Sequence, residues 1–153
     1  MKANILRRAA GFFSILILLA AFVANFSTHA APSSTTVFNV PFDFVVAGKT
    51  LPAGSYLVVR STLYSKDILS LRRLDDNEGV YVLTLTVESN ATQKDSKLVF
   101  NHYQDQYFLS EFWTSGETTG RKVLKSEKEK SLARAVEKRG MKTERVAVLS
   151  RQQ

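Results

Sequence analysis

The chain has 153 residues, with 21 Lys and Arg against 14 Asp and Glu, two His and no Cys. This length fits one domain, because typical domains hold about 100 to 150 residues. Without cysteine the chain forms no disulfide, no thiolate nucleophile and no cysteine-ligated metal centre. No motif specifies a reaction, so fold and location are what the sequence predicts best.

The first thirty residues have the three parts of a secretory signal peptide. Lys2, Arg7 and Arg8 form a basic start, and an uncharged, mostly apolar run follows from Ala9 to Ala24. Small residues up to Ala30 then offer a cleavage site. We therefore expect a secreted or periplasmic protein with no membrane span after cleavage. The alternative is an uncleaved signal anchor, since the apolar run is near the lower length limit for spanning a bilayer.

Cleavage changes the charge and the histidine count. Removing the three basic residues of the leader lowers the net charge from +7 to +4. Residues 31–120 carry −3 and residues 121–153 carry +7, so the basic character belongs to the C-terminal segment. His29 is lost with the leader, which leaves His102 as the single histidine.

Beyond a polar segment at 31–35, short apolar runs separated by turns predict a single, mainly β domain over residues 36–153. Pro41 lacks an amide hydrogen and predicts an edge strand or a bulge. Turns every eight to twelve residues favour an antiparallel β-sandwich or small barrel of about seven strands. The predicted strands are 36–46, 55–60, 67–74, 80–88, 97–103, 107–114 and 146–149.

The strand at 80–88 alternates between two sets of side chains. The set containing Tyr81, Leu83, Leu85 and Val87 is the more hydrophobic one, so we expect it to face the core.

The hairpin at 97–114 is rich in aromatic residues, and alternation places them on both of its faces. Tyr107, Leu109, Glu111 and Trp113 are predicted on one side, and Phe108, Ser110 and Phe112 on the other. One side should be core, while the other is either covered or an exposed strip that binds sugars or partners. The candidate ligand-binding residues are Tyr103, Tyr107, Glu111 and Trp113.

The C-terminal segment changes to a helical pattern. Ser126 followed by Glu129 is a capping box, and Gly140 is a plausible left-handed stop, which predicts a helix over 127–139. Most of this helix is polar, so it should pack one narrow face. Its cations are either an ordinary solvated face or a surface that docks on anionic polymers or lipid headgroups. The candidates for such docking are Lys128, Arg134, Lys138 and Arg139.

His102 is the only candidate for a neutral base near pH 7 in the cleaved chain. A small secreted hydrolase centred on His102, with Asp105 and Glu111, is therefore an alternative function. One His and no Cys cannot supply the usual zinc ligand sets. The acidic turn at 75–78 lacks the spacing of a calcium loop and is better explained as a solvated turn. We expect no metal and no cofactor.

Several stretches carry a resemblance to a known group of proteins. The main one is VPFDFVVAGKTLPAGSY at Val40–Tyr56, and the others are Ile68–Arg72, Asp95–Phe100 and Asp105–Glu111 with Trp113. In these stretches, which span most of residues 37–139, the chain resembles a family of short exported proteins from soil bacteria, acidobacteria in particular. The resemblance implies a bacterial exported protein and assigns no activity, ligand or residue role.

Together these features predict an exported, non-catalytic β domain with a binding or interaction role at the cell envelope or outside the cell. Its partner would be an envelope polysaccharide or another envelope protein. A nucleic acid is not expected, because an exported protein rarely meets one.

Overall fold

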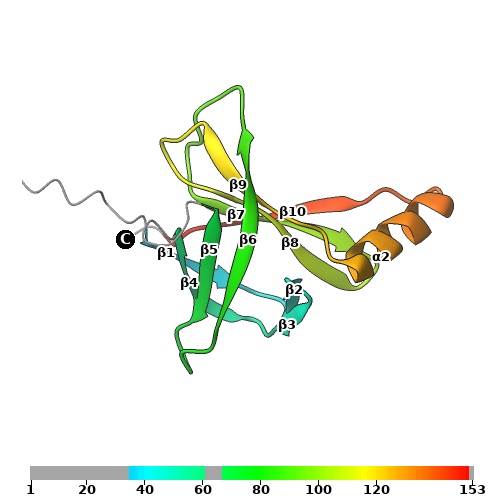
Figure 1. Ribbon diagram of the computed structural model, residues 1–153, viewed down its shortest axis with the longest axis horizontal. Helices are drawn as coiled ribbons and strands as arrows, with labels where there is room; N and C mark the ends of the chain where they lie inside the picture. Colours follow the sequence, from blue (N-terminus) through cyan, green and yellow to red (C-terminus); the bar gives the residue numbers. More distant parts are fainter. Residues whose placement is uncertain (1–34, 61–66, 152–153) are drawn as a thin grey trace, which may run out of the picture. The chain divides into compact units, whose positions relative to one another are not determined.

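The computed structural model describes residues 35–60 and 67–151 (Figure 1). The predicted leader at 1–30, with its cleavage site, and residues 31–34 of the predicted polar segment lie outside the described residues. Among the described residues, no helix is long and apolar enough to cross a membrane.

The described chain is mainly β, with ten strands and one helix. The elements are β1 (Thr35–Val40), β2 (Phe44–Val46), β3 (Lys49–Leu51), β4 (Gly54–Arg60), β5 (Ile68–Arg73), β6 (Gly79–Glu88), β7 (Lys97–Tyr103), β8 (Gln106–Trp113), β9 (Thr119–Val123), α2 (Glu127–Lys138) and β10 (Glu144–Leu149).

The strands form one open, mixed and mostly antiparallel sheet. Its order is β1-β4-β5-β6-β9-β8-β2-β3, and β7 pairs with β8 on one side and with β10 on the other. The pairing of β2 with β8 is parallel. Figure 1 shows the long strand β6 between the β1–β4–β5 group and β9.

The predicted mainly β fold with one C-terminal helix is confirmed. The small barrel and the purely antiparallel arrangement of about seven strands are wrong, because the described sheet is open, mixed and has ten strands. The sheet does not close, because β1 and β10 do not pair as strands in the described chain. An isolated bridge joins Phe38 of β1 to Ser150, just after β10. The predicted strand 36–46 is two strands, since the chain breaks at Pro41 and β2 then runs beside the start of β8.

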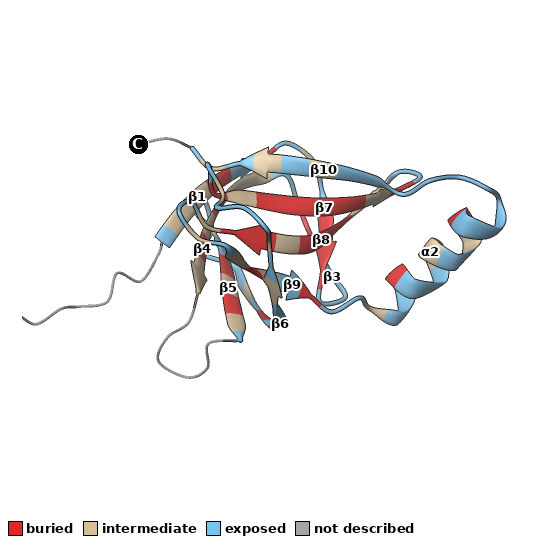
Figure 2. Cartoon of the chain, turned by 90° about the horizontal axis from the view of Figure 1, so that it is seen from above, coloured by how far each residue is buried: buried red, intermediate tan, exposed pale blue. Residues whose placement is uncertain are grey.

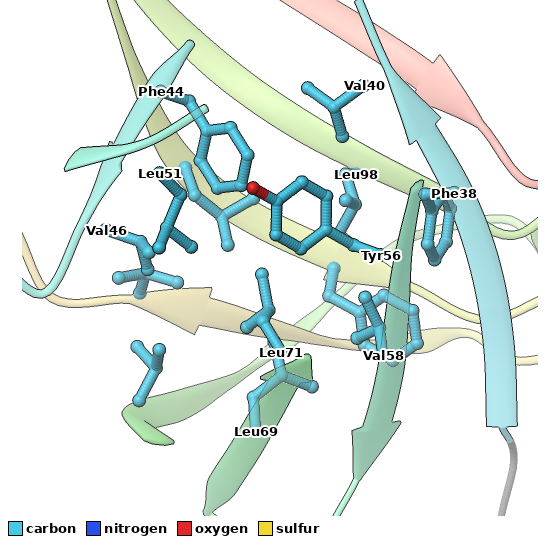
Figure 3. Packing of buried hydrophobic residues seen from close by; sticks show 14 of the residues in the cluster. Phe38, Val40, Phe44, Val46, Leu51, Tyr56, Val58, Leu69, Leu71 and Leu98 are labelled. Atoms are coloured by element: carbon cyan, nitrogen blue, oxygen red, sulfur yellow. The ribbon is translucent and has the colours of Figure 1, made fainter. Parts of the chain in front are cut away.

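Two clusters of apolar side chains lie on opposite faces of the sheet, the main core on the inner face and a smaller cluster under α2 on the outer face. The main core joins both halves of the sheet, and Figure 3 shows Tyr56 and Phe44 packed at its centre over Leu69 and Leu71. The Tyr56 hydroxyl donates a hydrogen bond to the Pro52 carbonyl at 2.6 Å, and burial raises the pKa of this phenol. The helix-side cluster is smaller and consists of Val45, Tyr103, Phe108 and Val136 of α2. Figure 2 shows buried residues concentrated in β7 and β8, whereas α2 and β10 are mostly exposed.

The predicted core face of β6 is reversed. Val82 and Thr84 point inward and are 2 % and 1 % exposed, whereas Tyr81, Leu83 and Leu85 point outward. The cause is the register with β5, which pairs Val82 with the fully buried Leu69. Thr84 is accommodated inside because its hydroxyl donates to the Asp67 carbonyl at 2.8 Å.

The predicted faces of β8 are also wrong for the residues after Ser110. Phe100 pairs with Leu109 while Val99 pairs with Glu111, so Ser110 is an extra residue in β8 that forms a β-bulge. The bulge shifts the alternation, which places Phe112 in the main core with Leu109. Glu111 and Trp113 consequently lie on the opposite, outer side of β8.

The helix is confirmed almost to the residue. It spans Glu127–Lys138, the Ser126 hydroxyl accepts a hydrogen bond from the Glu129 amide at 3.2 Å, and Gly140 has a φ of 69° after the helix end.

Candidate functional site

A shallow hollow of about 330 Å³ lies on the outer side of the sheet where β7, β8 and β10 run side by side. Each of the three strands contributes side chains, and the loop between β6 and β7 closes one wall. The lining residues are Ser89, Gln93, Lys97, Val99, Glu111, Trp113, Arg145 and Ala147.

Glu111 organises the polar side of this hollow. Its Oε2 atom accepts a hydrogen bond from Trp113 Nε1 at 2.9 Å and an ion-paired contact from Arg145 Nη2 at 2.7 Å. The Glu111 side chain is 15 % exposed and that of Arg145 is 55 % exposed. Glu111 thus fixes the indole and one guanidinium nitrogen, while the rest of the Arg145 guanidinium faces solvent.

Trp113 forms the apolar floor, and β9 determines how deeply it sits. A Cβ atom at Gly120 would lie 2.6 Å from Cε3 of Trp113, so the ring packs directly against the Gly120 backbone. The indole is 8 % exposed, which leaves a small apolar surface at the bottom of the hollow.

Lys97 is the second cation of this hollow. Within the part of the chain that the structure describes, Lys97 makes no ion pair or hydrogen bond through its side chain. The opposite wall is ordered by Gln93, whose Nε2 atom donates to Ser89 Oγ at 3.1 Å and to the Ala91 carbonyl at 3.2 Å. Two cations and one paired carboxyl group give the hollow a net charge of about +1.

The four predicted ligand-binding residues lie in three different environments. Glu111 and Trp113 line the hollow together, as described above. Tyr107 is stacked between two rings on the inner side, with centroid distances of 3.9 Å to Phe42 and 4.2 Å to His102. Tyr103 is 1 % exposed beneath α2. Tyr107 also lines a second hollow, of about 310 Å³. Of the four residues, Glu111 and Trp113 are the two that share one site.

Tyr103 is part of a polar network that attaches α2 to β7. Glu129 of α2 is 4 % exposed, and its Oε1 atom accepts hydrogen bonds from Asn101 Nδ2 at 2.9 Å and from the Tyr103 hydroxyl at 3.4 Å. Lys125 Nζ donates to the same hydroxyl at 3.1 Å. The capping residue predicted from sequence thus has a second role as a buried anchor.

The residues of the hydrolase alternative do not form one constellation. His102 Nδ1 lies 3.1 Å from Glu144 Oε2, whereas Glu111 is engaged by Arg145 and Trp113. Asp105 is in the exposed β7–β8 turn. No hydrogen bond or ion pair joins any two of His102, Asp105 and Glu111 within residues 35–60 and 67–151. In the same ranges there is no group of three or more His, Cys, Asp or Glu that could hold a metal ion.

The predicted docking cations of the helix are all exposed. Lys128 lines a second hollow, of about 310 Å³, together with Asp43 and Asp105. Arg134, Lys138 and Arg139 are on the solvent side and at the end of α2. These cations form a surface separate from the hollow at β7–β8–β10.

Sequence reasoning missed Lys97, Gln93 and Arg145 as site residues. The signal for Lys97 was alternation along the strand. Leu98 and Phe100 are core residues, so Lys97 and Val99 fall on the opposite face. Arg145 comes to the site through the pairing of β10 with β7, which local patterns do not predict.

No protein-family model, curated protein or solved structure matches the chain.

Proposed function

We propose that this protein is an exported, non-catalytic binding domain that attaches to an acidic polysaccharide of the bacterial cell envelope through the hollow at β7–β8–β10. The observation that carries the proposal is the Lys97 ammonium group, which has no ion pair or hydrogen bond within the described residues and shares the hollow with the half-exposed Arg145 and the indole of Trp113. Export rests on the predicted signal peptide and on the resemblance to exported soil-bacterial proteins.

The chemistry of the hollow suits a sugar acid. A carboxylate on the ligand would accept hydrogen bonds from Lys97 and from the guanidinium nitrogens of Arg145 that Glu111 leaves free. The apolar C–H face of a sugar ring would lie on the exposed part of Trp113. Ser89 and the ordered loop around Gln93 supply polar groups for ring hydroxyls. The hollow is open and shallow, which is compatible with one residue of a polymer chain.

Docking through the basic helix is the second candidate, and the exposure of Lys128, Arg134, Lys138 and Arg139 favours it. The two candidates differ in what they recognise. A row of solvated cations binds any polyanion with steep salt dependence, whereas the hollow requires a carboxylate and a ring together.

The two surfaces are separated by measuring binding to polygalacturonate, with neutral dextran as a reference polymer. The protein is produced with its own leader and purified from the exported fraction, and its intact mass shows whether the chain is cleaved after Ala30. Lys97→Gln and Arg145→Gln should each weaken binding to polygalacturonate about tenfold, because each removes one charge-assisted contact.

The matched control is Lys94→Gln, which neutralises an exposed lysine of the same loop region outside the hollow. A paired variant, Arg134→Gln with Lys138→Gln, removes two helix cations. The proposal fails if the helix variant weakens binding as much as the hollow variants do, or if dextran binds as well as polygalacturonate.

A further inference from the structure

A third hollow, of about 300 Å³, adjoins the hollow at β7–β8–β10. It is lined by residues 91–95 of the β6–β7 loop together with Lys97 and Leu149. Gln93 and Lys97 line both hollows, so the two hollows meet at these side chains. We call the third hollow the adjoining hollow, and the two hollows together the extended groove.

The pairing of the strands places the floors of the two hollows in one row across the outer face of the sheet. Lys97 of β7 lies opposite Trp113 of β8 and opposite Leu149 of β10, and Figure 2 shows β7 beside β10. Side chains that lie directly opposite each other share a face of the sheet. With neighbouring strands about 4.8 Å apart, the Cα atoms of Trp113 and Leu149 are separated by roughly 10 Å, about the length of a disaccharide.

Each hollow thus has an apolar surface of its own. Trp113 is the floor of the hollow at β7–β8–β10, and Leu149, which is 56 % exposed, is the apolar surface of the adjoining hollow. Lys97 lies between the two. An exposed leucine beside an indole and an ammonium group gives a second place where the apolar face of a sugar ring loses water on binding.

The wall of the extended groove is the β6–β7 loop, and hydrogen bonds to the β8–β9 connection fix its position. The Gln93 amide donates to the Glu117 carbonyl at 3.0 Å, and the Gly116 amide donates to the Gln93 carbonyl at 2.9 Å. The Ser115 hydroxyl donates to the Lys94 carbonyl at 2.7 Å. The wall is therefore preformed, so less conformational entropy is lost when a ligand binds.

The two hollows differ in the charge that they offer to a ligand. The hollow at β7–β8–β10 has two cations and one carboxyl group, as described above. The adjoining hollow adds Lys94 and Asp95, which carry opposite charges and are both exposed. Solvent and salt screen such charges strongly. The adjoining hollow therefore offers a sugar residue an apolar surface and hydroxyl partners without selecting a charge.

We propose that the extended groove binds two consecutive sugar residues, an acidic one and its neighbour in the chain. The acidic residue lies in the hollow at β7–β8–β10, with its carboxylate on Lys97 and Arg145. The neighbouring residue lies over Leu149, and the Thr92 hydroxyl group serves its ring hydroxyls. This inference rests on the proposed function, and it adds that the recognised unit is a disaccharide whose second residue needs no charge.

The test compares galacturonic acid with digalacturonic acid in amide NMR titrations of the exported protein. We expect the dimer to bind about tenfold more tightly than the monomer, because it fills both hollows. Leu149→Ser should abolish most of this gain and leave the dissociation constant of the monomer unchanged, since Leu149 is outside the hollow at β7–β8–β10. Because Leu149 is exposed, far-UV circular dichroism should be unchanged.

Leu124→Ser is the matched control, because Leu124 is a leucine of similar exposure, 50 %, outside the extended groove. It should keep the full gain from monomer to dimer. A hyaluronan tetrasaccharide, in which an acidic and a neutral sugar alternate, tests the second residue. It should also bind more tightly than the monomer, and Leu149→Ser should remove that gain; a gain confined to digalacturonic acid would overturn the neutral second position.

The monomer separates failure of this inference from failure of the proposed function. Equal affinities for monomer and dimer, or equal effects of Leu149→Ser and Leu124→Ser on the dimer, would show that the groove holds one sugar residue. The inference would then be wrong while the proposed function remained. If Lys97→Gln instead left the binding of the monomer unchanged, the proposed function itself would fail.

Discussion

At the scale of single residues, Gly120 and Trp113 determine the floor of the hollow. Gly120 is a strand residue without a positive φ, so its role is to leave space rather than to adopt a special conformation. The space is taken by the indole, whose Nε1 atom then reaches Glu111. A glycine that looks like a strand breaker in the sequence is therefore a requirement of the site.

Gly120→Ala should destabilise the protein by about 1–3 kcal/mol, the usual range for overpacking. The added Cβ would lie 2.6 Å from Trp113 Cε3 and 3.0 Å from the Phe112 carbonyl oxygen, so the ring or the strand must move. Urea unfolding measures the change. Gly54→Ala is the control, because its Cβ would meet only ordinary contacts, at 3.5 Å or more, and should change the unfolding free energy by less than about 0.5 kcal/mol. Equal effects of the two variants would contradict the packing described for Trp113.

At the scale of elements, α2 is held to the sheet by a small apolar contact and one buried carboxyl group. Val136 packs on Tyr103 and Phe108, and Glu129 accepts the hydrogen bond from Asn101. A narrow apolar face was expected from the helical pattern. The buried acid was not expected, because an acid at the third helical position has a sufficient local explanation in the capping box.

Glu129→Ala should cost about 1–3 kcal/mol of unfolding free energy, because the buried amide of Asn101 loses its acceptor. Glu129→Gln should cost less, since the amide oxygen can still accept from Asn101. Glu137→Ala, at an exposed acid of the same helix, serves as the control and should stay within about 0.5 kcal/mol. If urea unfolding shows no difference between Glu129→Ala and Glu137→Ala, Glu129 is not the anchor of α2.

Most elements could be predicted from the sequence, because their patterns are local. The helix has a cap and a stop, and the strands at 55–60 and 97–103 are confirmed nearly as expected. The strand β9 was missed because Thr119–Val123 contains a glycine and two cations and has no apolar alternation.

The faces of the strands were harder to predict than the strands themselves. Leu83 points outward because of how β6 pairs with β5. Glu111 lies on the outer face because the bulge at Ser110 shifts the alternation of side chains in β8. Both depend on register between strands, which hydrophobicity along one strand does not contain. For the same reason the sequence identified Trp113 and Glu111 but could not bring Arg145 to them.

At the scale of the whole molecule, an ion pair joins two distant parts of the sheet. Arg60 at the end of β4 donates two hydrogen bonds, of 3.0 and 2.7 Å, to the carboxyl oxygens of Glu117 in the β8–β9 connection. The Arg60 side chain is 22 % exposed and that of Glu117 is 31 % exposed. The hydrogen bonds from Arg60 hold the pKa of Glu117 below its ordinary value of 4.5.

This pair should contribute about 1 kcal/mol to the stability of the folded protein. Because the folded-state pKa of Glu117 is the lower one, the contribution is present above the unfolded-state pKa and is lost as the pH falls through the folded-state value. The unfolding free energy of Glu117→Gln should thus lie about 1 kcal/mol below that of the unmodified protein at pH 6 to 7, with the gap closing below pH 4.5.

Urea unfolding across this pH range is the measurement. Glu88→Gln is the control, since Glu88 is an exposed acid without an ion pair in the described part of the chain. A gap for Glu117→Gln that stays constant down to the lowest pH would contradict the assignment of the stability to the ionised pair.

The molecule thus presents two candidate binding surfaces, the hollow at β7–β8–β10 and the cations of α2. The central claim is that the first of these binds the ligand. The most direct test is an amide NMR titration of the exported protein with galacturonic acid oligomers. We predict that the largest shift changes fall at residues 97–99, 111–113 and 145–147, with little change along α2 and β6. Shift changes that concentrate on residues 127–139 or 79–88, or that are absent at millimolar ligand, would contradict this account.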